Sequence, residues 1–299
     1  MELRQLRAVL TLAEEGHFGK AAERLNIVPS ALSMQIRQLE EELGGPLFHR
    51  TTRRVDLTDA GSTLVLGARA LVEQTTSLRD EVRRRLRGEL GRIRIGFTGS
   101  QGVTGQMKQH IRAFHMRYPD VDLILREMGP VDQYEAIRQR DLDLGYTARL
   151  TPALPEPLIV HRAWPMDWQI LMATDHPLAS EAVVHPRMLA HQTFVTYAGQ
   201  ASDLLYAHPL ARLLGTMPVK MVRANSAMAV LSHVATGLAI TIVPSFEMDA
   251  QLPGLVSRPV DRLGPVLDLV MISHMQLDSP AVQLFIDSVD HEELDDAPK

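Results

Sequence analysis

The sequence predicts a mixed architecture: a small helical domain with a basic hairpin, then one long helix, then a larger α/β domain. Three observations lead to this prediction. Apolar residues recur at spacings of three and four through the first part of the chain, which is the pattern of amphipathic helices. Residues 58–87 contain no proline and only two glycines. From residue 91 onward, short apolar runs alternate with helical segments, which is typical of an α/β sheet.

Length and composition fit this organisation. The chain has 299 residues, which suggests two domains, and its 45% hydrophobic and 22% charged residues are ordinary for a globular protein. Its longest apolar runs are too short to span a bilayer. The residues after Met1 open an amphipathic pattern rather than an export signal, so we expect a cytoplasmic location and no membrane partner. The absence of cysteine excludes disulfides, thiolate metal sites and thiol redox switches.

Charge is distributed unevenly along the chain. The net charge is −5 overall, with +2 over residues 1–88 and −7 over the remainder. A near-neutral front and an acidic back would suit a DNA-binding head on a sensor body. An excess of two charges is also within the range of any solvated surface, so this signal is weak by itself.

The first 45 residues predict three helices. Residues 16–19 interrupt the first helix, and a short second helix follows over Lys20–Leu25. The third helix begins at Pro29, where a first helical turn tolerates proline, and ends before Gly44. The apolar stripes of the first and third helices are Leu3, Leu6, Leu10 and Ala13, and Leu32, Ile36, Leu39 and Leu43.

The opposite face of the third helix carries polar groups that could read DNA. It bears Ser30, Ser33, Met34, Arg37 and Glu41. Short polar side chains near a positive helix end can approach base edges and phosphates closely. Residues 48–58 predict two short strands joined by a basic tip, which together would form a wing. Its three arginines, at 50, 53 and 54, would lie near the DNA backbone or minor groove. A helical bundle with a basic hairpin and no nucleic-acid role explains the periodicity equally well.

Many positions in this region match one family in order: Phe18–Leu25, Ser30–Ser33, Gln35–Arg37, Leu39–Gly44, Pro46–Phe48, Arg50 and Leu57–Gly61. Together they resemble the head domain of the LysR family of transcription regulators. The resemblance implies a winged helix-turn-helix over residues 1–58, with Pro29–Leu43 as the recognition helix. The DNA-binding residues it implies are Pro29, Ser30, Ser33, Met34, Arg37, Arg50, Arg53 and Arg54.

Three residues depart from the family pattern. Met34 stands where the family usually carries arginine or lysine. Gly19 replaces the usual serine or threonine cap of the second helix, and Val28 replaces a serine before the recognition helix; each cap is worth about 1 kcal/mol. We expect Met34 to alter sequence preference through apolar contact with a thymine methyl group.

Residues 59–90 predict a linker helix with a heptad repeat. The candidate dimerisation residues on this seam are Leu64, Ala68, Leu71, Leu78 and Val82. The alternative is a single amphipathic helix packed on its own domain. The resemblance favours dimerisation, because LysR-type proteins dimerise through this helix and commonly form tetramers. The arginines at 83–85 and 87 are expected to form a solvated hinge, and a DNA contact there stays open.

The remaining residues, 91–299, predict alternating strands and helices. We expect two lobes, residues 91–161 plus 266–299 and residues 162–265. The tail from His291 is acidic and expected to fray. The predicted strands are Arg92–Phe97, Val121–Arg126, Leu142–Tyr146, Trp168–Ala173, Phe194–Thr196, Met221–Arg223, Ala239–Val243 and Pro265–Ser273, with later helices at Val131–Arg140 and Pro280–Val289.

Several short segments of this region resemble the LysR effector domain, which has the two-lobed fold of periplasmic solute-binding proteins. They are Arg94–Phe97, Tyr118–Val121, Asp141–Gly145, His176–Leu178, Asn225–Ser226 and Gly237–Ile240. The resemblance implies a small-molecule effector between the lobes, where loops after strands meet helix N-termini. An ordinary helix cap explains each serine or threonine equally well. The candidate effector-binding residues are Thr98, Ser100, Gln101, Gly102, Pro130, Ala148, Tyr197, Gln200, Ser202, Asn225 and Ser226.

The nature of the effector can be narrowed. Gly96–Ser100, Glu127–Gly129 and Gln133 resemble the branch that controls catechol and benzoate breakdown, whose inducers are muconate-like dicarboxylates. However, Pro130 stands where that branch has a ligand-binding threonine, and Ala148 where it has a ligand-binding arginine. We therefore expect a mono-anion or a mostly apolar small molecule.

Other classes of protein fit less well. An enzyme is the main rival, but the histidines lack metal-ligand spacing, and no P-loop, nucleophile elbow or dinucleotide fingerprint occurs. We therefore predict no catalytic residue, metal or cofactor. A plain solute-binding protein would leave the head unexplained. The expected partners are operator DNA, the effector and further copies of the chain, with RNA polymerase open as another.

Overall fold

The computed structural model describes residues 1–50, 54–98, 105–151, 153–198, 210–211, 214–215, 220–244, 252–261 and 267–295. The chain forms two compact units, Met1–Arg84 and Arg85–Lys299. Within the described residues, no helix is both long enough and apolar enough to cross a lipid bilayer.

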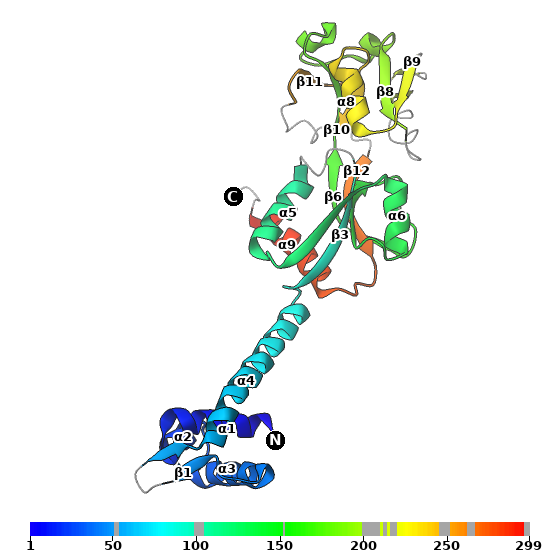
Figure 1. Cartoon of the computed structure of the whole chain (residues 1–299). Helices are drawn as coiled ribbons and strands as arrows, with labels where there is room; N and C mark the ends of the chain where they lie inside the picture. Colours follow the sequence, from blue (N-terminus) through cyan, green and yellow to red (C-terminus); the bar gives the residue numbers. More distant parts are fainter. Residues whose placement is uncertain are drawn as a thin grey trace. The chain divides into compact units, whose positions relative to one another are not determined.

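The first unit is a helical head with a two-stranded hairpin, followed by a long helix (Figure 1). Its elements are α1 (Leu3–Glu15), α2 (Phe18–Arg24), α3 (Pro29–Leu43), β1 (Phe48–Arg50), β2 (Val55–Leu57) and α4 (Asp59–Leu86). The head core is fully apolar and draws on α1, α2, α3 and the hairpin. It comprises Ala8, Val9, Leu12, Ala21, Ala22, Leu32, Ile36, Leu39, Leu47 and Phe48.

Helix ends in the head explain where the three helices begin and stop. Gly16 and Gly44 end α1 and α3 in the left-handed conformation that glycine adopts without strain. The second helix begins at Phe18, two residues before the prediction, because His17 caps it. The His17 ring Nδ1 accepts hydrogen bonds from the amides of Gly19 at 3.0 Å and Lys20 at 3.4 Å. Gly19 therefore lies inside the helix, and the predicted loss of a cap at this residue is wrong.

The hairpin is tied to the helices on both sides. Glu40 of α3 accepts hydrogen bonds from the amides of Leu47 at 2.9 Å and Phe48 at 3.4 Å. Gly61 of α4 lies so close to the hairpin that a Cβ atom there would stand 2.1 Å from the Leu47 carbonyl oxygen. Close packing thus fixes the direction in which the chain continues from α3 into the hairpin.

The second unit contains two lobes. The first lobe is a five-stranded sheet of order β4-β3-β5-β12-β6, in which β3 runs parallel to β4 and β5, and β12 runs antiparallel to its neighbours. Helices α5 and α9 cover one face and α6 the other (Figure 1). Its elements are β3 (Gly91–Phe97), α5 (Gly105–Arg117), β4 (Val121–Glu127), α6 (Pro130–Arg138), β5 (Leu144–Ala148), β6 (Leu158–Met166), β12 (Leu267–His274) and α9 (Pro280–Asp295).

The second lobe is built on the antiparallel sheet β10-β7-β11 and the parallel pair β8-β9. Helix α8 packs on these strands through an apolar cluster that includes Val195, Val234 and Val243. Its elements are β7 (Trp168–Ala173), the short 3-10 helices η2 (Pro177–Ser180) and η3 (Pro186–Leu189), β8 (Thr193–Tyr197), β9 (Lys220–Ala224), α8 (Ala227–Ala235), β10 (Thr241–Pro244) and β11 (Leu255–Pro259).

Three predicted boundaries need correction. Strands β6 and β11 were not predicted, and β6 carries the first lobe to Met166 rather than to residue 161. The third predicted strand begins at Leu144 rather than Leu142. Helix α9 continues through the acidic segment to Asp295, where fraying was expected from His291.

Candidate nucleic-acid interface and effector pocket

The outer face of α3 is the candidate DNA-reading surface. Leu32, Ile36 and Leu39 are fully buried in the head core, which turns the opposite face of the helix outward. On that face Pro29, Ser30 and Arg37 are exposed, Ser33 is half-buried and Met34 is 58% exposed. An exposed methionine at the centre of a polar face makes no contribution to the core, so its side chain is available to a ligand.

The wing supplies the second part of this surface. Strand β1 pairs antiparallel with β2 in the register Phe48 with Leu57 and Arg50 with Val55. Arg54 precedes β2 and is exposed. The side chain of Arg50 and all of Arg53 lie outside the part of the chain that the structure describes. The hairpin itself is thus confirmed, whereas the reach of two of its three arginines stays a prediction.

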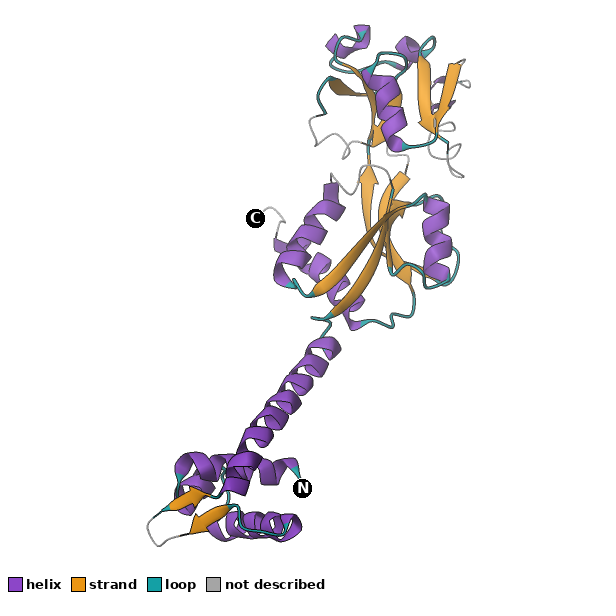
Figure 2. Ribbon diagram, in the orientation of Figure 1, coloured by secondary structure: helices purple, strands orange, loops and turns teal. Residues whose placement is uncertain are grey.

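The predicted dimer seam on α4 is buried near the start of the helix and exposed farther along. It is one continuous helix (Figure 2). Near its start, Leu64 packs against the head core and Ala68 is only 1% exposed. Ala68 therefore offers little surface to a partner in this chain, and its assignment to the dimer seam stays a prediction. Farther along, Leu71, Leu78 and Val82 are exposed.

A pocket of about 290 Å³ is lined by residues of both lobes of the second unit. The described lining residues from the first lobe are Thr98, Glu127, Met128 and Gly129, and those from the second lobe are Tyr197, Asn225, Ser226, Ala227, Val230, Leu231, Thr241, Ile242 and Val243. They lie at or just after the ends of β3, β4, β8 and β9, or belong to α8 and β10. This is the edge where the ends of strands meet the starts of helices, as expected for ligand sites in α/β domains.

Four of the predicted effector-binding residues come together at this pocket: Thr98, Tyr197, Asn225 and Ser226. Pro130 and Ala148 are buried and are not among the described lining residues. Five further candidates, Ser100, Gln101, Gly102, Gln200 and Ser202, lie outside the described residues. The sequence prediction missed the contributions of α8 and β10, because β10 gave only an apolar run and nothing in that run indicates a pocket wall.

A buried glutamine organises the first-lobe wall. The fully buried Gln133 donates from Nε2 to Thr98 Oγ1 and to the Met128 carbonyl oxygen, each at 3.0 Å. Thr98 Oγ1 in turn donates to the Met128 carbonyl at 3.2 Å. Gln133 lies over Gly96 and Gly145, where Cβ atoms would stand 3.0 and 2.7 Å from its Oε1. Two paired glycines therefore make room for the amide that fixes Thr98.

The position of the family's ligand-binding arginine has a different role here. Ala148 is 5% exposed, and its carbonyl oxygen accepts a hydrogen bond from the Tyr134 hydroxyl at 2.9 Å. Burial raises the pKa of Tyr134, so this hydroxyl remains a donor. The neighbouring Arg149 pairs with Asp268 at 3.8 Å and is not among the described lining residues. Arg149 therefore does not substitute for the missing cation.

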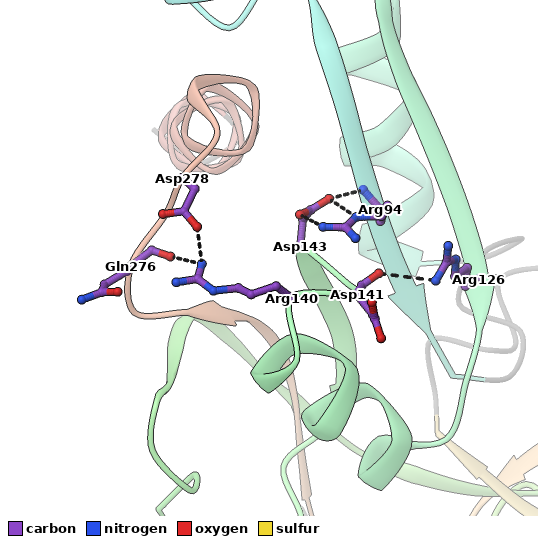
Figure 3. Close-up of polar contacts among 7 residues, drawn as sticks. All are labelled: Arg94, Arg126, Arg140, Asp141, Asp143, Gln276 and Asp278. Carbon is purple, nitrogen blue, oxygen red and sulfur yellow. Dashed lines mark hydrogen bonds and ion pairs between the residues drawn. The ribbon is translucent and has the colours of Figure 1, made fainter.

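Arginines elsewhere in the first lobe are committed to structural pairs (Figure 3). Arg94 donates to both carboxylate oxygens of Asp143 at 3.0 and 2.7 Å, and hydrogen bonding to this carboxylate raises the pKa of Arg94. Arg140 reaches the Asp278 carboxylate at 3.1 Å and the Gln276 carbonyl oxygen. These pairs join β3 and the α6–β5 turn to neighbouring segments and neutralise the charges of both arginines.

One histidine–serine contact resembles part of a hydrolytic site but cannot act as one. His161 Nε2 lies 2.7 Å from Ser273 Oγ. Ser273 donates its hydroxyl proton to the His274 carbonyl at 2.8 Å and is fully buried. The hydroxyl must therefore accept from His161, which leaves no base to activate it.

Comparison with known proteins covers nearly the whole chain. The family model described as "Bacterial regulatory helix-turn-helix protein, lysR family" matches residues 3–62, and the "LysR substrate binding domain" matches residues 86–293. The HTH-type transcriptional regulator XapR of Escherichia coli is 32% identical over 94% of this chain and 95% of its own length. AlsR of Bacillus subtilis, another HTH-type transcriptional regulator, is 30% identical over 96% and 94%.

Solved structures share the fold. Crystal structures of CbnR, a LysR family transcriptional regulator, match with a TM-score of 0.81 at 22% identity, covering 97% of this chain and all of CbnR. CbnR has also been solved full-length in complex with its target DNA, with a TM-score of 0.78 to this chain. Full-length BenM matches with a TM-score of 0.57 at 25% identity over 100% of this chain and 99% of BenM. By its two family domains and these relatives, the chain belongs to the LysR family of bacterial helix-turn-helix regulators.

Proposed function

We propose that this regulator binds operator DNA by inserting α3 into the major groove while the wing contacts the adjacent backbone. The observation that carries this proposal is the outer face of α3. Three buried residues hold the helix in the head, and a row of small polar, methionine and arginine side chains faces outward. A recognition helix requires this combination of rigid support and exposed short side chains. The complex of the structurally similar CbnR with its target DNA supports the same role.

Two copies of the chain would present two heads to a near-palindromic operator. The exposed Leu71, Leu78 and Val82 lie at heptad spacing on α4 and supply an apolar seam for the same helix of a second copy. We propose a dimer through this seam, with a dimer of dimers as the larger assembly. Light scattering of the wild type and of a Leu78→Glu variant tests this proposal. A variant of unchanged mass would contradict it.

A small organic compound, a mono-anion or an aromatic, would bind in the pocket between the lobes and change DNA binding or activation. Apolar side chains and a few convergent polar groups, as found here, are typical of small-molecule sites. Closure of the lobes on the compound would alter the assembly and the spacing of the heads. Under this proposal the second unit regulates and has no catalytic role.

The DNA-binding proposal is tested by selecting a binding site from random duplexes and measuring affinity at two salt concentrations. We expect specific binding that weakens steeply with salt, because phosphate contacts release counterions. Arg37→Ala on α3 should reduce affinity at least tenfold, whereas Arg79→Ala on α4, away from the reading face, should change it less than twofold. The proposal would be contradicted if no DNA sequence were enriched in the selection. It would also be contradicted if Arg37→Ala and Arg79→Ala lost equal amounts of affinity.

A further inference from the structure

We propose that the pocket selects a small monocarboxylate carrying a hydrogen-bond donor, above all an ammonium group, at its far end. The carboxylate would bind at the second-lobe wall and the donor at the first-lobe wall. This inference rests on the proposed function, because it specifies the class of compound that the effector pocket takes.

The second-lobe wall offers unused donors. Helix α8 is capped by Ser226, whose Oγ accepts from the Ala229 amide at 3.1 Å and whose carbonyl accepts from the Val230 amide at 3.1 Å. The amides of Ala227 and Met228 have no acceptor among the described residues, and Ala227 lines the pocket. The described lining residues of this lobe include no carboxylate. A free helix N-terminus without a nearby carboxylate attracts an anion.

Thr241 independently indicates a ligand at this wall. It is 1% exposed and lines the pocket, and its hydroxyl has no hydrogen-bond partner among the described residues. Side chains alternate along a strand, so Thr241 faces the same side of β10 as Val243, which packs with α8. Since Thr241 lines the pocket, a ligand there can supply the partner of this hydroxyl. Thr241 therefore supplies a third polar contact beside the start of α8.

The first-lobe wall has the opposite polarity. The Thr98 hydroxyl donates its hydrogen bond to the Met128 carbonyl and accepts one from Gln133. It can therefore offer a ligand only an acceptor. Glu127 lines the pocket and has no ion-pair or hydrogen-bond partner among the described residues. The start of α6 offers an anion little, because Pro130 removes one amide and the Asp132 carboxylate in the first turn offsets the positive end of the helix. This wall therefore attracts a donor and repels a carboxylate.

The space between the walls suits a small, largely apolar body. Met128, Val230, Leu231 and Ile242 line it. A volume of about 290 Å³ holds about ten water-sized groups at roughly 30 Å³ each. None of the described lining residues is a lysine or an arginine. A second carboxylate on the ligand would therefore find no such partner among them.

Calorimetry with the full-length protein and two matched sets of probes tests the proposal. The rigid set is 4-(aminomethyl)benzoate, benzoate, terephthalate and benzylamine, and the flexible set is 6-aminohexanoate, hexanoate and adipate. In at least one set we expect the probe with both an ammonium and a carboxylate group to bind at least tenfold more tightly than the diacid. It should exceed each probe with a single charged group by the same factor. Equal or tighter binding of the diacid would overturn the proposal, as would failure of both amino acids to bind.

Variants separate the two walls. Glu127→Gln should lower the affinity for the ammonium-bearing probe at least tenfold. It should therefore reduce the difference in affinity between that probe and the diacid. Asp122→Asn, on the same strand but paired with Arg92 outside the pocket, should leave affinity unchanged. Ala227→Pro deletes one amide at a position that tolerates proline, since Ser226 is extended with φ −152° and ψ 157°. Ala227→Pro should weaken the binding of every carboxylate probe with little change in melting temperature. Thr241→Val should weaken the binding of the same probes by a smaller factor.

Failure of this inference can be distinguished from failure of the proposed function. If the protein binds its selected DNA and a diacid or neutral compound changes that binding, the regulator proposal holds and the ligand class is wrong. If no specific DNA binding occurs, the proposed function fails whatever the probes do. Equal responses of Glu127→Gln and Asp122→Asn would overturn the assignment of the donor to the first-lobe wall.

Discussion

The proposed reading face of α3 and the proposed effector pocket represent two ways of building a recognition surface. The first uses one helix of 15 residues, whose inner face is buried and whose outer face carries the candidate contacts. The second gathers residues at the ends of β3, β4, β8 and β9 and on α8 and β10, which span the chain from Thr98 to Val243. Recognition on α3 therefore depends on single exposed side chains, whereas the pocket depends on buried hydrogen bonds that hold its walls in place.

The largest expected effect is the difference in stability between variants on the buried face and on the exposed face of α3. Ile36→Ala should lower the free energy of unfolding of the head by about 2–5 kcal/mol, because it leaves a cavity in a fully buried core. Met34→Ala, two residues away and 58% exposed, should change it by less than about 0.5 kcal/mol. Urea unfolding followed by circular dichroism measures both. Both tryptophans lie in the second unit, so their fluorescence provides an internal control. Similar losses for the two variants would contradict this division of the helix.

The same division explains how much could be predicted from the sequence. In the head, apolar spacing marked Leu32, Ile36, Leu39 and Leu43 as the buried stripe of α3. The first three are fully buried, whereas Leu43 at the helix end is 49% exposed. The outward face could be predicted because a helix places side chains by local geometry. The pocket depends on contacts between distant segments. Thr98 and Ser226 could be found because they follow strands, but Thr241 lies within an apolar strand and carries no local signal. Strand β6 was missed for a related reason: it contains His161, Arg162 and Pro165, which obscure its apolar pattern.

The second prediction tests whether buried bonds hold the pocket wall. Gln133→Leu removes the hydrogen bonds that the amide donates to Thr98 and to the Met128 carbonyl. It should cost about 1–3 kcal/mol of stability, since each such bond contributes about 0.5–1.5 kcal/mol. Gln139→Leu, at the exposed end of the same helix, should cost less than about 0.5 kcal/mol. Tryptophan fluorescence during urea unfolding reports the second unit. If Gln133→Leu were as stable as Gln139→Leu, the wall would not depend on this amide.

The third prediction concerns pH and applies to the second unit. Burial lowers the pKa of His161; Arg162 also lowers it, while Asp290 and Asp287 partly oppose the shift. The unfolded chain therefore takes up a proton at higher pH than the folded one. Stability should be complete above the ordinary histidine pKa of about 6.5 and should fall as pH drops toward the lowered value, by at most about 1.4 kcal/mol per pH unit.

Substitution of His161 by glutamine checks the assignment. Unfolding measured between pH 7 and pH 5 should show a shallower pH dependence in His161→Gln than in the wild type, whatever its absolute stability. His115→Gln, on the outer side of α5, provides the matched control and should keep the wild-type slope. An unchanged slope in His161→Gln would show that another group causes the pH dependence.

The smallest expected effect sharpens the account of the head, where the sequence pattern was otherwise most informative. The His17 ring caps α2 through the amides of Gly19 and Lys20, so His17→Ala should destabilise the head by about 0.5–1 kcal/mol. A Cβ atom at Gly19 would stand 3.0 Å from the His17 ring. Gly19→Ala should therefore disturb the same cap, even though alanine favours helices. In a His17→Ser background serine can cap without that contact, so Gly19→Ala should become neutral or stabilising. If Gly19→Ala had the same effect in both backgrounds, the glycine would not be there to accommodate the histidine.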